Sequence, residues 1–436
     1  MVSVSMSSSS LQVKIDNLTF GGDFIGNVNF SADQSLLGIK AFVPYCLPGE
    51  EVKVEIVEKK SQFLKTRLLE VITPAADREQ PLCSHFMLCG GCELQQMKYQ
   101  AQLRAKQEMI LNALRGLPYL KNVETLLQPL AASSPYRYRL RAVFHGNQDG
   151  QIGFFKPQTH DVVSIEECHI LTEKLASLVP RLKEFGTMVC ALAFSLNLAE
   201  DEQGVIAVIE GQEIKTKEDL TKIAEAADRL FVNYIVKQNG KELLVKGRNE
   251  LSYSLQKNSE LKLIVPAGGF SQVNWQVNQL LIEKVVEECL ADRGKTVLDL
   301  YAGAGNFTLP LAQAGFFVTA VECDARLVNL GKKNISKNNL ADKIKYFGQS
   351  VEVFLKQSNA CKTSDIVILD PPRSGLQKTA EAINFGKKLI LLSCYFPSFI
   401  NDLKALQRYG WQVKQIAPFD MFPQTSLVEI MTVLTR

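Results

Sequence analysis

Ten of the 436 residues are cysteines, and three of them have a spacing typical of metal ligands. Cys83, Cys89 and Cys92 follow the pattern C-x5-C-x2-C, with two glycines that let the chain fold around a compact group. Cys168 is a natural fourth ligand from the central part of the chain. Four thiolates suit either a 4Fe-4S cluster or a structural zinc ion, and their spacing does not choose between these groups.

Cys394 stands apart from the remaining cysteines because it ends an apolar stretch that is predicted to be a strand. A thiolate there could act as a nucleophile, whereas a lone cysteine at a strand end is more often structural. Five other cysteines lie in plain apolar or helical contexts and are predicted to be packing residues: Cys46, Cys190, Cys289, Cys323 and Cys361.

The methylation of carbon 5 of uracil is one reaction that needs such a thiolate. Carbon 5 is a poor nucleophile until a thiolate adds to carbon 6 and makes an enolate-like intermediate. Carbon 5 can then attack a sulfonium methyl group, after which a base removes the carbon 5 proton and the thiolate is expelled. With Cys394 as the nucleophile, Glu429 in the last predicted strand is the candidate base.

A glycine-rich turn, Asp-Leu-Tyr-Ala-Gly-Ala-Gly-Asn-Phe at residues 299–307, follows an apolar stretch and precedes a helical pattern. Such a turn lets the backbone pass close beneath a bound nucleoside, a feature that dinucleotide enzymes share. Glu322 ends the next predicted strand, where its carboxylate could accept both ribose hydroxyls. Because the turn lacks G-x-G-x-x-G and no phosphate-binding lysine loop is present, it favours S-adenosylmethionine over nicotinamide cofactors.

A sheet must position these residues, and residues 265–436 have the pattern of one. Apolar stretches alternate there with amphipathic helical patterns, which is typical of a parallel α/β sheet. Because ligands of open α/β sheets bind at the carboxyl ends of strands, Glu322, Asp370 and Cys394 should share one edge. Ordinary strand-end carboxylates remain the alternative for the two acids. The expected strands are residues 296–300, 317–322, 365–370, 388–394 and 428–434.

The rest of the chain predicts two further domains. Short alternating apolar runs over residues 11–72, broken by glycine and proline, predict a small β-barrel. The segment at residues 42–52 resembles the TRAM domain, an RNA-binding barrel of the oligonucleotide-binding type. Residues 80–260 carry the cysteine cluster, a helical pattern and candidate strands at 142–145 and 205–209, which predict an α+β central domain.

The net charge of +3, from 49 basic and 46 acidic residues, excludes a general preference for polyanions. The segment Tyr136–Arg141 alternates aromatic and cationic side chains, which suits single-stranded RNA, although a strand with one polar face has the same pattern. The wider basic excess could equally be a solvated helix face. Its eight residues are Lys98, Arg104, Lys106, Arg115, Lys121, Arg137, Arg139 and Arg141.

The sequence has no apolar run of the roughly 18 residues that a membrane span needs, and its N-terminus lacks the layout of a secretory signal. We therefore expect a cytoplasmic protein that is not associated with a membrane. The sequence indicates no obligate protein partner.

Taken together, these motifs resemble the bacterial RNA 5-methyluridine methyltransferases, in the group with a TRAM domain and an iron-sulfur cluster. The resemblance covers nearly the whole chain. It includes the barrel, the cysteine loop, the segments at residues 135–139, 153–156 and 270–274, the turn at 301–307, Ser393-Cys394 and the segment at 420–423.

The resemblance implies a Rossmann-like class I methyltransferase domain that uses S-adenosylmethionine, with Cys394 as the nucleophile and Glu429 as the base. It favours a 4Fe-4S cluster for the four cysteines, and Asp370 is compatible with a contact to the uracil as well as to the cofactor. The residues that fall on cofactor-contacting positions are Gln272, Tyr301, Glu322 and Asp370, with Asn306 and Gln349 on secondary ones.

Two departures from the family pattern bear on the substrate. The family usually has Asn-Pro after its nucleophile, where this chain has Tyr395-Phe396, and its usual histidines near the end are replaced in residues 423–429. By resemblance, a barrel with a cluster favours ribosomal RNA. Transfer RNA with the same chemistry and a non-catalytic RNA-binding protein are the alternatives. An amino-group methyltransferase is disfavoured because Arg373 follows Asp-Pro-Pro where an aromatic residue would be needed.

Overall fold

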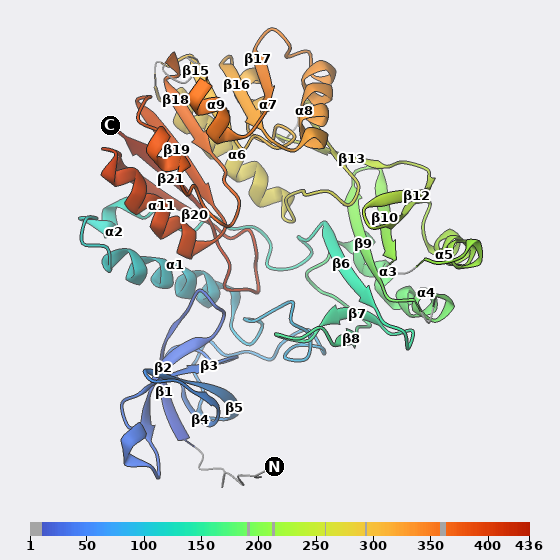
Figure 1. Ribbon diagram of the computed structural model, residues 1–436. Helices are drawn as coiled ribbons and strands as arrows, with labels where there is room; N and C mark the ends of the chain where they lie inside the picture. The colour runs from blue at the N-terminus through green and yellow to red at the C-terminus, as the bar shows by residue number, and fades with distance from the viewer. Residues whose placement is uncertain (1–10, 190–191, 212–213, 258, 293, 358–362) are drawn as a thin grey trace. The chain divides into compact units, whose positions relative to one another are not determined.

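The computed structural model describes residues 11–189, 192–211, 214–257, 259–292, 294–357 and 363–436 (Figure 1). It divides into two compact units. The first contains the chain up to Val123 together with Phe155–His160 and Phe422–Leu427, and the second contains the remainder. Two of the cysteines predicted to be packing residues, Cys190 and Cys361, lie outside the described residues.

The first unit begins with a closed barrel in the order β1-β2-β3-β5-β4, which confirms the predicted N-terminal barrel. Buried and exposed residues alternate along β1, so that one set of side chains fills the interior. Position 26 in β2 requires glycine, because a Cβ there would be 2.1 Å from the carbonyl oxygen of Lys14. The strands are β1 (Leu11–Leu18), β2 (Phe24–Phe30), β3 (Lys40–Val43), β4 (Glu51–Lys59) and β5 (Phe63–Thr73), with η1 (Gln34–Leu36) before β3.

The rest of the first unit is the cysteine-containing loop and the helix α1 (Tyr99–Arg115). One face of α1 is buried, and it includes the polar residues Gln102 and Lys106 as well as Met109, Ile110 and Leu114. The short helix α2 (Val123–Leu126) follows at the boundary of the two units.

The second unit contains a seven-stranded sheet in the order β12-β11-β10-β9-β6-β7-β8 and a hairpin of β13 and β14. Its core includes Phe144, Phe185 and Leu196, which are fully buried. The strands are β6 (Arg141–Gly146), β7 (Ile152–Phe155), β8 (Val162–Ser164), β9 (Phe194–Asp201), β10 (Gly204–Gly211), β11 (Asn233–Gln238), β12 (Lys241–Lys246), β13 (Glu250–Ser254) and β14 (Lys262–Pro266). The helical elements are α3 (Glu173–Leu178), η2 (Val179–Arg181), α4 (Leu182–Met188) and α5 (Lys217–Leu230).

The second unit also contains the predicted α/β sheet, in the order β17-β16-β15-β18-β19-β21-β20. All five expected strands are present, and β17 and β20 are additional. The prediction of a parallel sheet is wrong at one strand, because β21 is antiparallel to both of its neighbours. The strands are β15 (Thr296–Leu300), β16 (Phe317–Glu322), β17 (Ile344–Gly348), β18 (Ile366–Leu369), β19 (Lys388–Ser393), β20 (Gln412–Phe419) and β21 (Glu429–Thr435).

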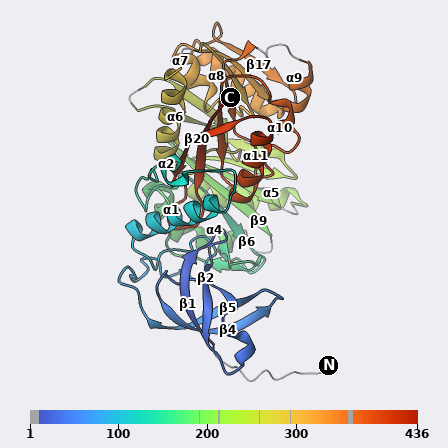
Figure 2. The same ribbon diagram turned by 90° about the vertical axis from the view of Figure 1, so that its left-hand side faces the viewer.

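Helices cover both faces of this sheet, which explains why β18 and β19 are buried along their whole length. Figure 2 shows α6 and α7 on one face and α9, α10 and α11 on the other. The helices are α6 (Trp275–Leu290), α7 (Thr308–Gln313), α8 (Ala325–Lys337), α9 (Val351–Gln357), α10 (Thr379–Ala382) and α11 (Phe396–Arg408). Among the described residues, no helix has both the length and the apolar character needed to cross a bilayer.

Candidate active site

The glycine-rich turn after β15 has an unusual backbone. Tyr301, Gly303 and Gly305 all have positive φ angles, of 65°, 58° and 107°. A left-handed conformation costs little at glycine and more at tyrosine, so the surrounding structure must hold Tyr301 in place. The amide of Ala302 donates to the carbonyl of Val321 on the adjacent strand, at 3.0 Å, which fixes the start of the turn.

Two side chains that the sequence analysis did not single out support the turn. The Tyr346 hydroxyl donates to the carbonyl of Gly303, and the Asn334 amide donates to the carbonyl of Ala304 at 3.0 Å. Asn334 is fully buried and also binds the backbone of Ile264, so it ties the turn to β14. These donors hold the carbonyls of the turn on the side of β17 and α8, and the peptide planes of the turn are thereby fixed.

Glu322 lies at the end of β16 and is bound by backbone amides. One carboxylate oxygen accepts from Gly303 at 3.0 Å, and the other accepts from Cys323 at 2.8 Å and Asp324 at 2.9 Å. The carboxylate therefore has a fixed orientation beside the turn, as an acceptor of ribose hydroxyls needs to have. Cys323 is exposed, so its prediction as a packing residue is wrong, whereas Cys46 and Cys289 are buried as predicted.

The other predicted cofactor-contacting residues lie in several segments of the chain. The Tyr301 hydroxyl is 3.1 Å from Thr379 Oγ1, and the amide groups of Asn306 and Asn278 donate to each other at 3.0 and 3.1 Å. Gln272 is half-buried in the segment before α6, and Gln349 is half-buried directly after β17. Their roles in cofactor binding stay predictions.

Cys394 and Glu429 are brought together by the antiparallel pairing of β19 and β21. Ser393, the last residue of β19, pairs with Ile430, so the next step of the register sets Cys394 opposite Glu429. Glu429 is 5% exposed, and it also pairs with Phe419 on β20. The reversed direction of β21 is therefore what puts its first residue at the carboxyl edge of the parallel strands.

The ionisable groups at this edge affect one another. Burial raises the pKa of the Asp370 carboxyl to about 7, and burial together with Asp370 raises the pKa of Glu429 well above its ordinary value. Burial, Glu429 and Asp370 also raise the pKa of the Cys394 thiol to about 11, although Arg373 opposes this by its charge and a hydrogen bond. Each of these shifts favours the protonated form of its group.

The Tyr136–Arg141 segment is mostly a loop that leads into β6, and its arginines bind backbone carbonyls. Arg137 donates to Leu171 at 3.4 Å, Arg139 to Arg141 at 2.9 Å, and Arg141 to Gly269 at 2.5 Å. The Arg141 guanidinium also lies 5.8 Å from the centre of the exposed Phe270 ring. These contacts favour a structural role over phosphate binding for the three arginines.

Cys83, Cys89 and Cys92 are half-buried cysteines in one loop of the first unit. Successive turns form this loop, and the backbone amide of Cys89 donates to the carbonyl of His85 at 2.9 Å. The backbone amide of Gly91 donates to the sulfur of Cys89 at 3.4 Å. Hydrogen bonds from amides to sulfur are a feature of thiolates that bind iron-sulfur clusters. Cys168 is also a half-buried cysteine, but it belongs to the second unit.

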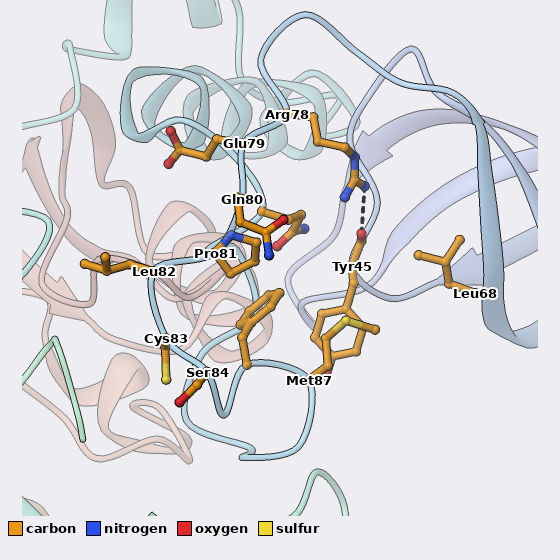
Figure 3. A pocket seen from close by; sticks show the side chains of 12 residues that line it. Tyr45, Leu68, Arg78, Glu79, Gln80, Pro81, Leu82, Cys83, Ser84 and Met87 are labelled. Carbon is orange, nitrogen blue, oxygen red and sulfur yellow. Dashed lines mark hydrogen bonds between the residues drawn. The ribbon is translucent and has the colours of Figure 1, made fainter. Parts of the chain in front are cut away.

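A cavity of about 730 Å³ lies beside this loop, between it and the barrel (Figure 3). Tyr45 and Leu68 come from the barrel side, and Cys83 lies at the opposite wall. Arg78 lies in the segment that leads from β5 to the cysteine loop. It donates to the carbonyl of Tyr45 at 2.9 Å and forms an ion pair with the fully buried Glu50. The barrel and the cysteine loop are thereby joined within one unit.

Comparison with family models matches the chain to two descriptions. The model described as tRNA (Uracil-5-)-methyltransferase matches residues 98–436, and the TRAM domain model matches residues 5–69. The first match covers the central and C-terminal sheets, and the second covers most of the closed barrel.

Known proteins similar to this chain include several 23S rRNA (uracil(1939)-C(5))-methyltransferases RlmD. That of Shewanella woodyi is 30% identical over 405 residues, which are 90% of this chain and 90% of that protein. That of Vibrio vulnificus is 29% identical and covers 91% of each chain. The solved Pyrococcus abyssi tRNA (uracil-54, C5)-methyltransferase in complex with S-adenosyl-L-homocysteine has a TM-score of 0.75 and 22% identity, over 98% of this chain and 99% of that one, which shows a shared fold.

Proposed function

The chain belongs to the tRNA (uracil-5-)-methyltransferase family, and on this premise we propose that it methylates carbon 5 of one uridine in 23S ribosomal RNA. The names of the similar curated proteins favour ribosomal RNA. Transfer RNA, the substrate class in the description of the family model, is the second candidate with the same chemistry. A ribosomal RNA substrate implies that the protein acts in the cytoplasm.

The observation that carries this proposal is the register of β19 and β21. It sets a thiol and a buried carboxyl group opposite each other, at the edge where the glycine-rich turn and Glu322 are also found. A thiol nucleophile and a separate base are the two groups that methylation at carbon 5 of uracil requires. A non-catalytic RNA-binding protein would have no need of this pair.

The reaction follows from the positions of these residues. Cys394 loses its proton to water, and its thiolate sulfur bonds to carbon 6 of the uracil. The 5,6 double bond opens in this step, and its electrons make carbon 5 nucleophilic. S-adenosylmethionine, when bound, supplies the electrophilic methyl group that carbon 5 accepts. Glu429 then takes the proton from carbon 5, and the bond between the Cys394 sulfur and carbon 6 breaks to restore the ring. Asp370, beside both residues, could hold the uracil or the methyl donor.

For the methyl donor we propose a site around the turn after β15. Glu322 has the fixed orientation needed to accept the ribose hydroxyls, and the supported turn leaves space above Gly303, where a Cβ would have no neighbour within 4 Å. The turn residues Tyr301 and Asn306 would lie beside the nucleoside. Gln272, Gln349 and Asp370 complete the proposed set.

For the cysteines we propose a 4Fe-4S cluster held by Cys83, Cys89, Cys92 and Cys168. The half-buried cysteines and the amide-to-sulfur bond in the loop fit such a cluster, and four thiolates would fit zinc as the alternative. Methyl transfer moves no electrons, so we assign the cluster a structural role. It would join the cysteine loop to the segment that carries Cys168.

The function is tested by incubating the protein with S-adenosylmethionine and unmodified 23S ribosomal RNA or transfer RNA, and mapping 5-methyluridine in each. We expect one modified uridine in ribosomal RNA, and none with Cys394→Ala. Cys289→Ala is the matched control, because Cys289 is a buried thiol on α6 and should be dispensable. Methylation of transfer RNA alone would overturn the substrate, and methylation by Cys394→Ala would overturn the chemistry.

A further inference from the structure

The segment Phe422–Leu427 ends two residues before Glu429, yet it belongs to the first unit together with helix α1. Gln424, Thr425 and Ser426 are buried, and Gln424 has a positive φ of 68°. A buried segment with a left-handed residue at its centre needs specific partners for its polar backbone groups. The partners that hold it are on α1 and in the loop before it.

Lys106 is the central partner. Its side chain is fully buried, and its ammonium group donates to the carbonyl of Phe422 at 3.1 Å and to the carbonyl of Leu427 at 3.2 Å. One cation therefore binds both ends of the segment. Lys106 belongs to the basic excess for which the sequence indicates an RNA surface or a solvated helix face. Because its side chain is buried, both interpretations are wrong for this residue.

Gln102, one turn earlier on α1, binds the middle of the segment. Its side-chain amide donates to Gln424 Oε1 at 2.9 Å, and its side-chain oxygen accepts from the Gln424 amide at 3.2 Å. Glu93 binds the segment at a third position, where its carboxylate accepts from the Ser426 amide at 2.9 Å. Buried hydrogen bonds to charged groups are the stronger ones, so these contacts should fix the segment firmly.

The path from this segment to the base is short. Leu427 and Glu429 are separated by one residue, which spans at most roughly 7 Å between their Cα atoms. On its other side, Glu429 is fixed by its pairing with Phe419. The position of the carboxyl group therefore depends on where the chain enters β21, and the contacts of Lys106 set that point.

We propose that Lys106 is a positioning residue for Glu429, so that it controls removal of the carbon 5 proton and leaves methyl transfer largely unaffected. The inference rests on the proposed function, since it assigns Glu429 the role of base. The groups for addition to carbon 6 and for methyl transfer lie elsewhere in the chain. Cys394 follows β19, and the turn proposed to hold the methyl donor follows β15. A misplacement of about 1 Å can slow a step by roughly a hundredfold, so loss of this contact should slow elimination alone.

Lys106→Met tests the proposal, because it keeps the length of the side chain and removes the ammonium group. With unmodified uridine RNA and S-adenosylmethionine, one round of S-adenosylhomocysteine should form at nearly the wild-type rate. Release of methylated RNA should fall at least about tenfold, and a covalent protein-RNA adduct should accumulate on a denaturing gel. Loss of methyl transfer and turnover in equal proportion, without an adduct, would overturn the proposal.

Two further variants keep the test decisive. Gln102→Leu removes the bonds to Gln424 while keeping Lys106, so it should also accumulate the adduct if Lys106→Met does not fold. Lys388→Met is the matched control, because Lys388 is a buried lysine at the start of β19 that binds Glu288 and Asp292. It should lower thermal stability without accumulating the adduct, and an adduct in this control would overturn the proposal.

Failure of the inference can be told apart from failure of the proposed function. Wild-type protein should form an adduct with 5-fluorouridine RNA through Cys394. If it does so while Lys106→Met and Gln102→Leu accumulate no adduct with uridine RNA, only the inference on Lys106 is overturned. If wild-type protein forms no such adduct, the proposed function is itself contradicted.

Discussion

Cys394 and Glu429 lie opposite each other across two antiparallel strands, one step beyond the pair of Ser393 and Ile430. This relationship makes each group part of the other's environment, because the Glu429 carboxyl is second only to burial in raising the pKa of the Cys394 thiol. The nucleophile and the base therefore cannot both be ionised without a cost in electrostatic energy.

The first prediction concerns the pH dependence of catalysis. Cys394, with a pKa of about 11, must lose its proton to attack, and the pKa of Glu429 is also raised. The Cys394 thiolate and the Glu429 carboxylate, which are the active forms, therefore become more populated as pH rises. We expect kcat/KM to increase through neutral pH and to keep increasing to at least about pH 9. Initial rates over a pH series in a constant ionic-strength buffer measure this, and a profile that is flat or falling above neutral pH would contradict it.

The second prediction concerns the base. Glu429→Gln keeps the size of the side chain but cannot accept the carbon 5 proton, so turnover should fall by roughly 10²- to 10⁴-fold. Methylated RNA should stay bound to Cys394, and this adduct can be quantified by gel and mass spectrometry. Free 5-methyluridine RNA formed at the wild-type rate would mean that another group is the base.

The third prediction concerns the support of the glycine-rich turn. Tyr346→Phe removes the hydroxyl that donates to Gly303, which should weaken binding of S-adenosylhomocysteine by about tenfold, the effect of one hydrogen bond. Calorimetric titration measures the affinity. Tyr234→Phe is the matched control, because that buried tyrosine on β11 donates to Asp228 on α5 and its loss should leave the affinity unchanged. Equal loss in both variants would argue against a specific role for Tyr346.

The fourth prediction concerns stability. Burial raises the pKa of Asp299 to about 7, so the folded state binds this proton more tightly than the unfolded chain does. Stability from this group is therefore lost as pH rises from about 4 to 7 and stays low above that range. The free energy of unfolding of Asp299→Asn should exceed that of wild type by on the order of 4 kcal/mol at pH 8, with little difference at pH 4. Urea titrations at both pH values measure the free energy of unfolding. An equal effect of the substitution at pH 4 and pH 8 would contradict a raised pKa of Asp299.

The fifth prediction concerns the cysteines. Protein purified without oxygen should be brown and contain about four iron atoms per chain, the content of one 4Fe-4S cluster. Cys89→Ser should lose the iron and its visible absorbance, whereas Cys46→Ser, at a buried thiol of the same unit, should keep both. A colourless wild-type protein that contains zinc would favour the structural zinc site instead.

The parts of the fold that could be predicted are those with strong local patterns. The strands at residues 296–300 and 317–322 were predicted at their observed bounds, because each is an apolar run that ends at a turn or a charged residue. By contrast, β17 and β20 alternate buried and exposed residues only in part and were missed. The direction of β21 depends on long-range pairing, which a local pattern does not contain.

The same distinction holds for the site. The positions of Cys394, Glu322 and Asp370 at strand ends could be predicted because they follow from the order of apolar runs, whereas their roles stay predictions. Tyr346 and Asn334 could not, since they act on the turn through contacts across the sheet. Lys106 was misread because a lysine is almost always exposed, and only the fold supplies the two carbonyls that bind it.

The central claim is that the Cys394 sulfur bonds to carbon 6 of the target uracil. Incubation with S-adenosylmethionine and RNA that carries 5-fluorouridine should trap this bond, because the fluorine on carbon 5 cannot leave as a proton does. Mass spectrometry of the digested adduct should then find the nucleotide on the peptide that contains Cys394, and Cys394→Ala should give no adduct. An adduct on another residue, or full methylation of uridine by Cys394→Ala, would contradict the account.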